Sequence, residues 1–284
     1  MKYYIIIPAH NEEKYISHTL DSILTQTLLP KKVLIVNDNS TDATEEIIDS
    51  YCLKHDLFKK INTTVSSKEH MPGSKVINAF YKGLEVLDAE YDFIVKLDAD
   101  IIAPNHYFET IAHRFKNNKK IGIAGGFAYE KNKHGTWLRN HPMNKDHVRG
   151  AFKSYTKTCF KAIGGLKNAM GWDTIDELLA QYHGFEIYTN EDLKVKHLRP
   201  TGNAYNKKAK WLQGKAMYTM RYGFCITSIA SLKMALKQKK IATFFYNLQG
   251  YRKAKREKAA YLVSKEEGKF IRNLRWKNIK KKLL

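Results

Sequence analysis

Two carboxylates, Asp98 and Asp100, end the aromatic and β-branched run at 93–100, with one small residue between them. Side chains alternate between the faces of a strand, so positions i and i+2 point the same way. Two like charges this close repel unless a positive group lies beside them, and a divalent cation with oxygen ligands suits such a pair. A solitary Asp-x-Asp is more often an acidic turn that ends a strand, so its meaning depends on the rest of the chain.

Polar motifs also follow two earlier predicted strands. Residues 8–12 follow the apolar run 3–7, and residues 38–42 follow the run 32–36. Further strands are predicted at 61–65, 93–100, 121–124 and 185–188, and helices at 15–24, 73–87 and 107–115, with another that begins near Asp42 and is capped by Ser40 or Thr41. This alternation predicts an α/β fold with a doubly wound, mostly parallel sheet, whose ligands bind at the carboxyl ends of the strands. All three polar motifs fall at such ends.

The positive charge is concentrated at the C-terminal end. The 284 residues carry a formal net charge of +21, yet residues 201–284 hold 22 Lys and Arg against 3 Asp and Glu. In residues 205–284 these cations alternate with aromatic and aliphatic residues, a pattern typical of basic amphipathic helices on anionic membrane surfaces. A helical subdomain packed on the body, with its lysines in solvent, explains the same pattern. We therefore predict an α/β domain at 1–204 and a basic helical extension at 205–284.

The composition also suggests a cellular location. No apolar run approaches the 18 residues of a membrane span, and no charged-then-apolar leader precedes the first strand. The three cysteines, Cys52, Cys159 and Cys225, are odd in number and widely spaced, which favours reduced thiols over a disulfide framework. These features predict a cytoplasmic protein, peripheral at the inner face of the membrane.

The motifs in combination resemble a known family. Pro-Ala-His-Asn-Glu-Glu at 8–13, Val-Asn-Asp-Asn-Ser-Thr-Asp at 36–42 and Leu-Asp-Ala-Asp at 97–100 resemble the three nucleotide-site signatures of family 2 glycosyltransferases. Gly164-Gly165-Leu166, followed by Trp172-Asp173 and Gly184, is similar to the acceptor half of that family. The resemblance covers about residues 1–200 and implies the nucleotide-sugar-binding fold called GT-A. It also implies inverting transfer of a sugar from a nucleoside-diphosphate sugar to a hydroxyl of a glycan or lipid-linked acceptor, in cell-surface polysaccharide or lipid-linked glycan synthesis.

The resemblance assigns a nucleotide-sugar site to the three early motifs. Asp38 would accept a hydrogen bond from the base, Glu12 would lie near the ribose, and Lys75 would meet the base or the diphosphate. The full set of nucleotide-sugar residues that it implies is Pro8, Ala9, His10, Asn11, Glu12, Asp38, Lys75, Asp98, Ala99 and Asp100.

The same resemblance implies a Mg²⁺ or Mn²⁺ ion that bridges the diphosphate. Asp100 would coordinate it, and Asp98 would lie beside the ribose and the metal. His197 is a candidate for a third ligand, although a histidine that is hydrogen-bonded locally explains it equally. Arg199 and Lys207 are candidates for diphosphate contacts from the C-terminal side.

A catalytic base is the remaining requirement, because an acceptor hydroxyl needs a carboxylate within reach as it attacks. Asp173 holds the position of the family's base, and its spacing to Gly184 also fits. The family usually has an acidic residue just before the base, whereas this chain has Trp172. Asp176, one helical turn on, is therefore the alternative base, and Trp172 is a candidate for stacking on a sugar ring.

Two other classes of protein explain part of the pattern. A nucleotidyltransferase shares the sheet and the paired aspartates, but its first strand is usually followed by a glycine-rich loop with Arg and Lys, which residues 8–13 lack. A basic module that binds nucleic acid or a membrane explains residues 205–284, with aromatic side chains stacked on bases in the first case. It leaves the three acidic strand-end motifs unexplained, so nucleic acid is the less favoured partner.

Overall fold

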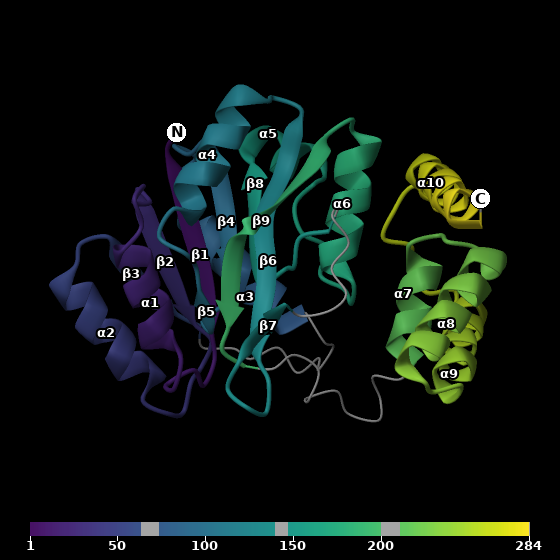
Figure 1. Cartoon of the computed structure of the whole chain (residues 1–284), viewed down its shortest axis with the longest axis horizontal. Helices are drawn as coiled ribbons and strands as arrows, with labels where there is room; N and C mark the ends of the chain where they lie inside the picture. Colours follow the sequence, from purple (N-terminus) through teal and green to yellow (C-terminus); the bar gives the residue numbers. More distant parts are fainter. Residues whose placement is uncertain (64–73, 140–146, 200–210, 284) are drawn as a thin grey trace.

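The computed structural model describes residues 1–63, 74–139, 147–199 and 211–283, which form one mixed sheet flanked by helices (Figure 1). The strands are β1 (Tyr3–Ala9), β2 (Lys32–Asn37), β3 (Phe58–Asn62), β4 (Phe93–Leu97), β5 (Ile101–Ile102), β6 (Ile121–Lys131), β7 (Trp137–Arg139), β8 (Phe152–Thr156) and β9 (Glu186–His197). Their order is β3-β2-β1-β4-β8-β6-β9-β5, with β7 paired to β6. The helices are α1 (Ile16–Leu24), α2 (Thr44–Lys54), α3 (Ser74–Glu85), α4 (Tyr107–Asn117), α5 (Lys157–Ala162), α6 (Trp172–Tyr182), α7 (Leu212–Thr219), α8 (Phe224–Gln238), α9 (Ala242–Arg256) and α10 (Lys265–Leu283).

The N-terminal half of the sheet is parallel, as predicted. Strands β3, β2, β1 and β4 run the same way, because helices cross between them. Every residue of β1 except Pro8 is buried, as expected of a parallel strand covered on both faces. The Tyr3 ring stacks on Phe93 at 4.7 Å and packs against Phe108 at 5.0 Å, which fixes β1 and β4 to helix α4.

Strand β8 is the main feature that the sequence pattern failed to predict. It runs antiparallel to both β4 and β6, so the sheet changes direction at its centre. Its sequence, Phe-Lys-Ser-Tyr-Thr, contains two polar residues that are nonetheless buried, Lys153 and Ser154. The backbone N–H of Asp98 donates to the Ala151 carbonyl at 2.7 Å, so β8 reaches the Asp98–Asp100 segment directly.

Two local predictions also need correction. The third strand is Phe58–Asn62 and begins three residues before the predicted 61–65, because the buried Phe58 pairs with Val33 on β2; residues 64 and 65 lie outside the described residues. Neither Ser40 nor Thr41 caps α2; the Asp42 carboxylate instead accepts from the Thr44 N–H at 3.1 Å.

Helices α7–α10 stand together beyond α6 (Figure 1). Their inner apolar side chains, among them Met220 and Ile271, belong to the same buried cluster as the sheet. The Phe270 ring lies 5.6 Å from that of Tyr182 on α6, so α10 packs on the body. Within the described residues, no helix combines the length and apolarity needed to cross a membrane. The predicted boundary between residues 204 and 205 lies outside the described residues.

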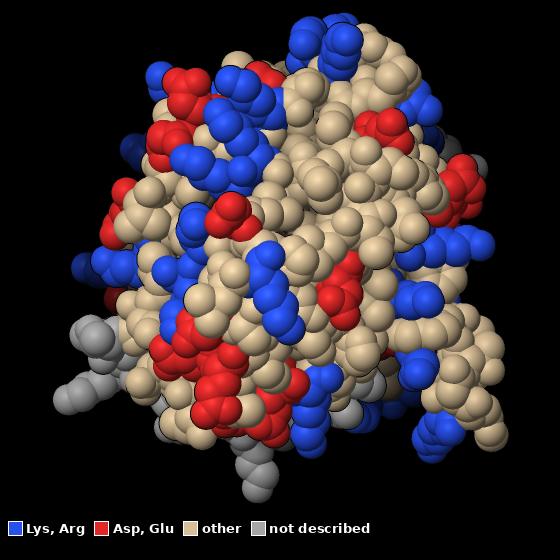
Figure 2. All heavy atoms as spheres, turned by 90° about the vertical axis from the view of Figure 1, so that its left-hand side faces the viewer, with Lys and Arg blue, Asp and Glu red and all other residues tan. Residues whose placement is uncertain are grey.

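The body itself carries mixed charge. On the face over β3 and α2, lysines and arginines lie beside aspartates and glutamates (Figure 2). Lys60, for example, pairs with Glu45 and with Asp49, each at 2.7 Å. This agrees with the near-neutral balance of the first 200 residues and leaves the basic excess to the C-terminal helices.

Candidate functional site

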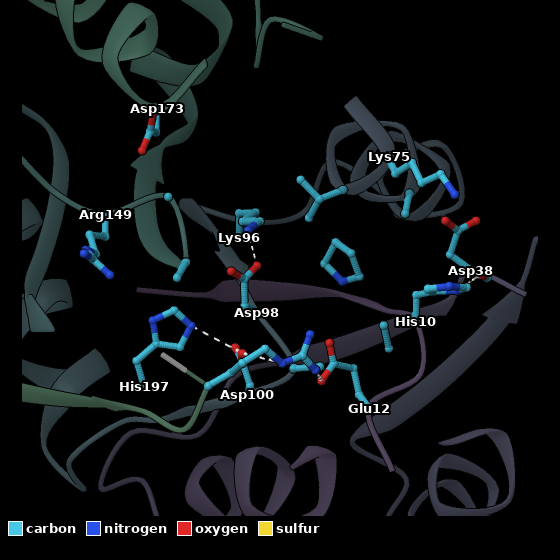
Figure 3. Close-up of a pocket in the computed structure, with 18 of the residues that line it drawn as sticks. His10, Glu12, Asp38, Lys75, Lys96, Asp98, Asp100, Arg149, Asp173 and His197 are labelled. Atoms are coloured by element: carbon cyan, nitrogen blue, oxygen red, sulfur yellow. Dashed lines mark hydrogen bonds and ion pairs between the residues drawn. The ribbon is translucent and has the colours of Figure 1, made fainter. Parts of the chain in front are cut away.

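A cavity of about 610 Å³ opens where the strands of the sheet end (Figure 3). The residues that line it come from the ends of β1, β4 and β9, the segment after β2, the start of α3, the segment before β8 and the first turn of α6. Of the predicted site residues it brings together Pro8, Ala9, His10, Glu12, Asp38, Lys75, Asp98, Ala99, Asp100, Asp173, His197 and Arg199. Lys207 lies outside the described residues.

The first two motifs meet on one side of this cavity. The His10 ring is held by Nδ1, which lies 2.7 Å from the Asp38 carbonyl, and Asp38 Oδ1 accepts from the Thr63 hydroxyl at 2.6 Å. Asn11 does not line the cavity, in contrast to the prediction. Its backbone has a φ of 55°, and its side-chain oxygen accepts from the Thr41 N–H at 2.8 Å, so it joins the two motifs instead.

Glu12 and Arg199 form an ion pair across the mouth of the cavity. Burial raises the pKa of Glu12 to about 7; Arg199 opposes this rise, and the carboxylates of Asp100, Asp98 and Asp42 add to it. Glu12 therefore changes its charge near neutral pH, at the position where the resemblance expects ribose hydroxyls.

We expect nucleoside binding to report this titration. Below pH of about 7 Glu12 is protonated, and above it the carboxylate accepts hydrogen bonds from hydroxyl donors, so affinity should rise between about pH 6 and pH 8. The uncharged nucleoside of the donor, titrated calorimetrically without metal, isolates this group from phosphate and metal effects. Glu12→Gln should flatten the rise. If nucleoside affinity rises as steeply with pH in Glu12→Gln as in the wild type, the pH dependence belongs to another group.

The paired aspartates lie on the floor of the cavity. Asp98 forms an ion pair with Lys96, a buried β4 lysine that the motif analysis missed. Burial raises the pKa of Asp98, with Lys96 opposing and Asp100 adding to the rise. The sequence did contain a signal for Lys96, because it is the single lysine in an otherwise apolar strand. A cation buried in this way needs an anionic partner.

Asp100 faces the C-terminal end of β9. Its Oδ2 lies 3.3 Å from His197 Nε2 and 3.9 Å from Arg199 Nε. The His197 Nδ1 lies 3.7 Å from a Glu130 carboxylate oxygen and is buried without a hydrogen-bond partner in the described structure. Asp100 and His197, the two predicted metal ligands, therefore lie close together.

This donor set fits part of a divalent-metal site. A carboxylate and an imidazole face one another, with a second carboxylate two residues away, and these are ligands that Mn²⁺ and Mg²⁺ accept. Among the described residues, no group of three or more His, Cys, Asp or Glu is arranged as a complete site. Asp100 and His197 would therefore hold a cation that takes its other ligands from a diphosphate and water, as Mg²⁺ commonly does.

The two candidates for the base occupy different environments. Asp173 lies in the first turn of α6 and lines the cavity, beside the buried Trp172 ring. Asp176 is fully buried, 3.1 Å from Lys153 Nζ, and accepts from the Tyr155 hydroxyl at 2.5 Å. Of these two carboxylates, Asp173 lines the cavity and Asp176 does not. Trp172 packs over Lys96, whose Nζ lies 5.3 Å from the ring centroid, and also lines the cavity.

Residues 4–170 match the model of glycosyl transferase family 2. The chain belongs to this family. It is 26% identical over 233 residues to the poly-β-1,6-N-acetyl-D-glucosamine synthase of Staphylococcus epidermidis, covering 74% of this chain and 53% of that protein. An uncharacterized glycosyltransferase of Mycoplasma genitalium, MG025, is 28% identical over 58% of this chain and 57% of its own. The chain thus spans about half the length of these relatives.

Solved structures confirm the GT-A fold. S. aureus TarS 1–349 in complex with UDP-GlcNAc aligns with a TM-score of 0.58 at 21% identity, over 78% of this chain and 65% of that one. The mannosyltransferase PcManGT from Pyrobaculum calidifontis, in complex with GDP-Man and Mn²⁺, gives 0.58 at 15% identity, over 95% and 78%. The predicted fold and family are therefore confirmed.

A buried charge cluster supports the acceptor half of this family 2 protein. Lys153 Nζ donates to the Asp173 carbonyl at 2.6 Å and to Glu177 at 2.9 Å, besides its contacts to Asp176. Glu177 also accepts from the Val148 N–H at 2.8 Å and lies 2.9 Å from His147 Nδ1. Although burial opposes it, the neighbouring carboxylates raise the pKa of Lys153 to about 12, so the lysine stays charged. Sequence reasoning missed this cluster, which joins the segment before β8 to α6.

Lys153→Met should therefore destabilise the protein strongly. Removing one member of a buried ion cluster leaves two carboxylates without their cation, which costs about 3–5 kcal/mol. The free energy of unfolding in urea measures this loss. Lys161→Met on the surface of α5 is the matched control and should change stability by less than about 0.5 kcal/mol. Equal stability of the two variants would contradict a structural role for the cluster.

Proposed function

We propose that this chain is an inverting, divalent-metal-dependent glycosyltransferase that moves a sugar from a nucleoside-diphosphate sugar to a hydroxyl acceptor. One observation carries the proposal: Asp173 and the Asp98–Asp100 pair, 73 residues apart in the sequence, line the same cavity. That arrangement supplies a base and an anchor for the diphosphate on either side of the space that a sugar would occupy.

Each residue has a chemical task in this proposal. Glu12 and Asp38 accept hydrogen bonds from the nucleoside, while Lys75 and Arg199 offer positive charge to the diphosphate. A Mg²⁺ or Mn²⁺ ion held by Asp100 and His197 would stabilise the negative charge on the leaving diphosphate. Asp173 takes the proton of the acceptor hydroxyl. A single base suffices for one displacement, which inverts the anomeric centre.

The relatives support a role in cell-surface polymer synthesis. The S. epidermidis protein is named for poly-N-acetylglucosamine synthesis, and the TarS structure contains UDP-GlcNAc. Another solved relative contains GDP-Man. We therefore propose a glycan or a lipid-linked glycan as the acceptor, and UDP- and GDP-sugars as the donors to test first.

A thermal-shift panel tests the donor. UDP-, GDP- and dTDP-sugars are each added with and without Mn²⁺, and a donor present at about 100 times its Kd should stabilise the fold by about 2.7 kcal/mol. The expected result is a metal-dependent shift for one nucleotide class. No shift in any arm contradicts the proposal. Release of pyrophosphate from UTP or GTP with a sugar phosphate would favour a nucleotidyltransferase instead.

The surface of α8 and α9 supports a peripheral position at the inner face of a membrane. Leu236, Ile241 and Phe245 are 68%, 62% and 57% exposed around the turn between these helices. Lys239 and Lys240 lie in the same turn. Apolar side chains surrounded by lysines suit the headgroup region of an anionic leaflet.

We expect co-sedimentation with vesicles that contain phosphatidylserine, weakening as salt rises. The double change Leu236→Glu and Ile241→Glu should lower vesicle affinity by more than about 10-fold, because it removes two apolar side chains from the contact. Leu53→Glu on α2, where Leu53 is 88% exposed, is the control and should bind normally. Binding to RNA in place of vesicles, or an equal loss in the control, would contradict membrane association.

A further inference from the structure

A second cavity, of about 510 Å³, lies between the C-terminal helices and the body. Its size falls within the roughly 300–1,000 Å³ typical of small-molecule sites. Helices α7, α8 and α10, with the residues between α7 and α8, supply most of its wall, and the wall is largely apolar. The apolar side chains are Met217, Tyr222, Ile226, Ile229, Met234 and Ile279.

This groove adjoins the donor cavity through the first turn of α6. Thr174 lines the groove, whereas the preceding residue, Asp173, lines the donor cavity. The end of α7 packs closely on the start of α6, since a methyl group on Gly171 would lie 3.6 Å from Met220 Cε. A single helical turn therefore separates an apolar groove from the carboxylate that we propose as the base.

The charged groups of the groove are both cationic. Arg275 and Lys233 line it, and no acidic side chain does so among the described residues. Arg275 Nη2 donates to the Tyr222 hydroxyl at 2.7 Å, and its guanidinium carbon lies 5.1 Å from the Tyr222 ring centroid. Its Nε is buried and has no hydrogen-bond partner in the described structure. A buried N–H that remains unpaired is costly, so a bound acceptor atom there would be stabilised.

We propose that this groove binds a lipid phosphate: the apolar chain lies along the groove and the phosphate meets Arg275. An aliphatic wall matches a hydrocarbon chain, and a guanidinium matches a phosphate better than it matches a neutral hydroxyl. An uncharged glycan would place hydroxyls against the apolar side chains that form most of the wall. The further idea that this lipid phosphate carries the sugar acceptor rests on the proposed function. Only if Asp173 is the base of sugar transfer does the phosphate end of the lipid need to reach it.

Titration calorimetry with decyl phosphate below its critical micelle concentration tests the groove in the full-length chain. Ile229→Asp, which places a charge in the wall, should weaken binding at least ~10-fold. Leu232→Asp is the matched control, because Leu232 lies on the same helix, is exposed and does not line the groove. It should bind like the wild type. An unaffected Ile229→Asp, or an equal loss in Leu232→Asp, overturns the proposal.

Arg275 is tested by comparing ligands rather than by affinity alone. The wild type should bind decyl phosphate about 10-fold more tightly than decanol, because a hydrogen bond to a charged group is stronger than one to a neutral group. Arg275→Gln should reduce this preference to about 2-fold or less while retaining decanol binding. Retained decanol binding shows that the groove is still folded. A preference that survives in the variant overturns the assignment of the phosphate to Arg275.

Donor binding in the same samples separates this inference from the proposed function. Ile229→Asp should show the wild-type thermal shift with the nucleotide sugar and Mn²⁺, because the donor cavity is distinct. If the wild type binds the donor but not decyl phosphate, the lipid-phosphate proposal is overturned and the proposed function is not. Decyl phosphate binding without any donor binding overturns the proposed function and leaves a lipid-phosphate site.

Discussion

Asp173→Asn should lower the turnover of sugar transfer by at least ~100-fold, the usual contribution of a positioned general base. The amide keeps the shape of the side chain but cannot take the proton of the acceptor hydroxyl. Because we propose that Asp173 contacts the acceptor rather than the donor, donor affinity should stay within about 2-fold of the wild type. Single-turnover transfer, measured with saturating donor and a range of acceptor concentrations, separates the chemical step from binding.

The comparison with Asp176→Asn makes this test specific. Asp176 is buried against Lys153 and Tyr155, so its replacement should lower the melting temperature rather than selectively abolish chemistry. Asp173→Asn, in contrast, should melt within a few degrees of the wild type. Undiminished transfer by Asp173→Asn would remove it as the base and return Asp176 to that role.

Asp100→Ala should remove the metal-dependent part of donor binding while leaving the fold intact. The change deletes the carboxylate that faces His197 Nε2 at 3.3 Å, and a cation held by His197 alone would bind weakly. Affinity for the donor, measured calorimetrically with and without Mn²⁺, should become equal in the variant. In the wild type we expect the ion to raise affinity by ~10-fold or more.

Asp192→Ala on the same strand as His197 is the control, since Asp192 is exposed and does not line the cavity. It should retain the full effect of Mn²⁺. If Asp100→Ala also retains that effect, the metal is held elsewhere or is not used, and the interpretation of the Asp98–Asp100 pair is wrong. Circular dichroism and the melting temperature of each variant establish that the fold is unchanged.

The donor side of the site was predictable because local rules govern it. Strand β4 ends at Leu97, and the turn that follows it, Asp98-Ala99-Asp100, lines the cavity, as expected at the carboxyl end of a parallel strand. The parallel half of the sheet followed from short apolar runs that end in polar motifs. These features depend on neighbours within a few residues, so periodicity and turn chemistry are sufficient to predict them.

The acceptor side depends on contacts between residues that are distant in the sequence. Lys153 is tolerated inside β8 only because Asp176 and Glu177, 23 and 24 residues later, neutralise it. No local pattern predicts such a partner, so Phe152–Thr156 did not appear as a strand. For the same reason the spacing of Asp173 and Asp176 left the base undecided: which one is buried depends on how α6 docks on β8.

The ion pairs of the donor cavity have a consequence for the order of events. Lys96 and Arg199 already neutralise Asp98 and Glu12. A divalent cation held by Asp100 and His197 would compete with Lys96 and Arg199 for these carboxylates, and an incoming diphosphate would give the two protein cations new partners. Cation and nucleotide sugar should therefore each bind more tightly in the presence of the other, and thermodynamic reciprocity makes the two factors equal. We therefore expect metal alone, or nucleotide sugar alone, to bind more weakly than the two together.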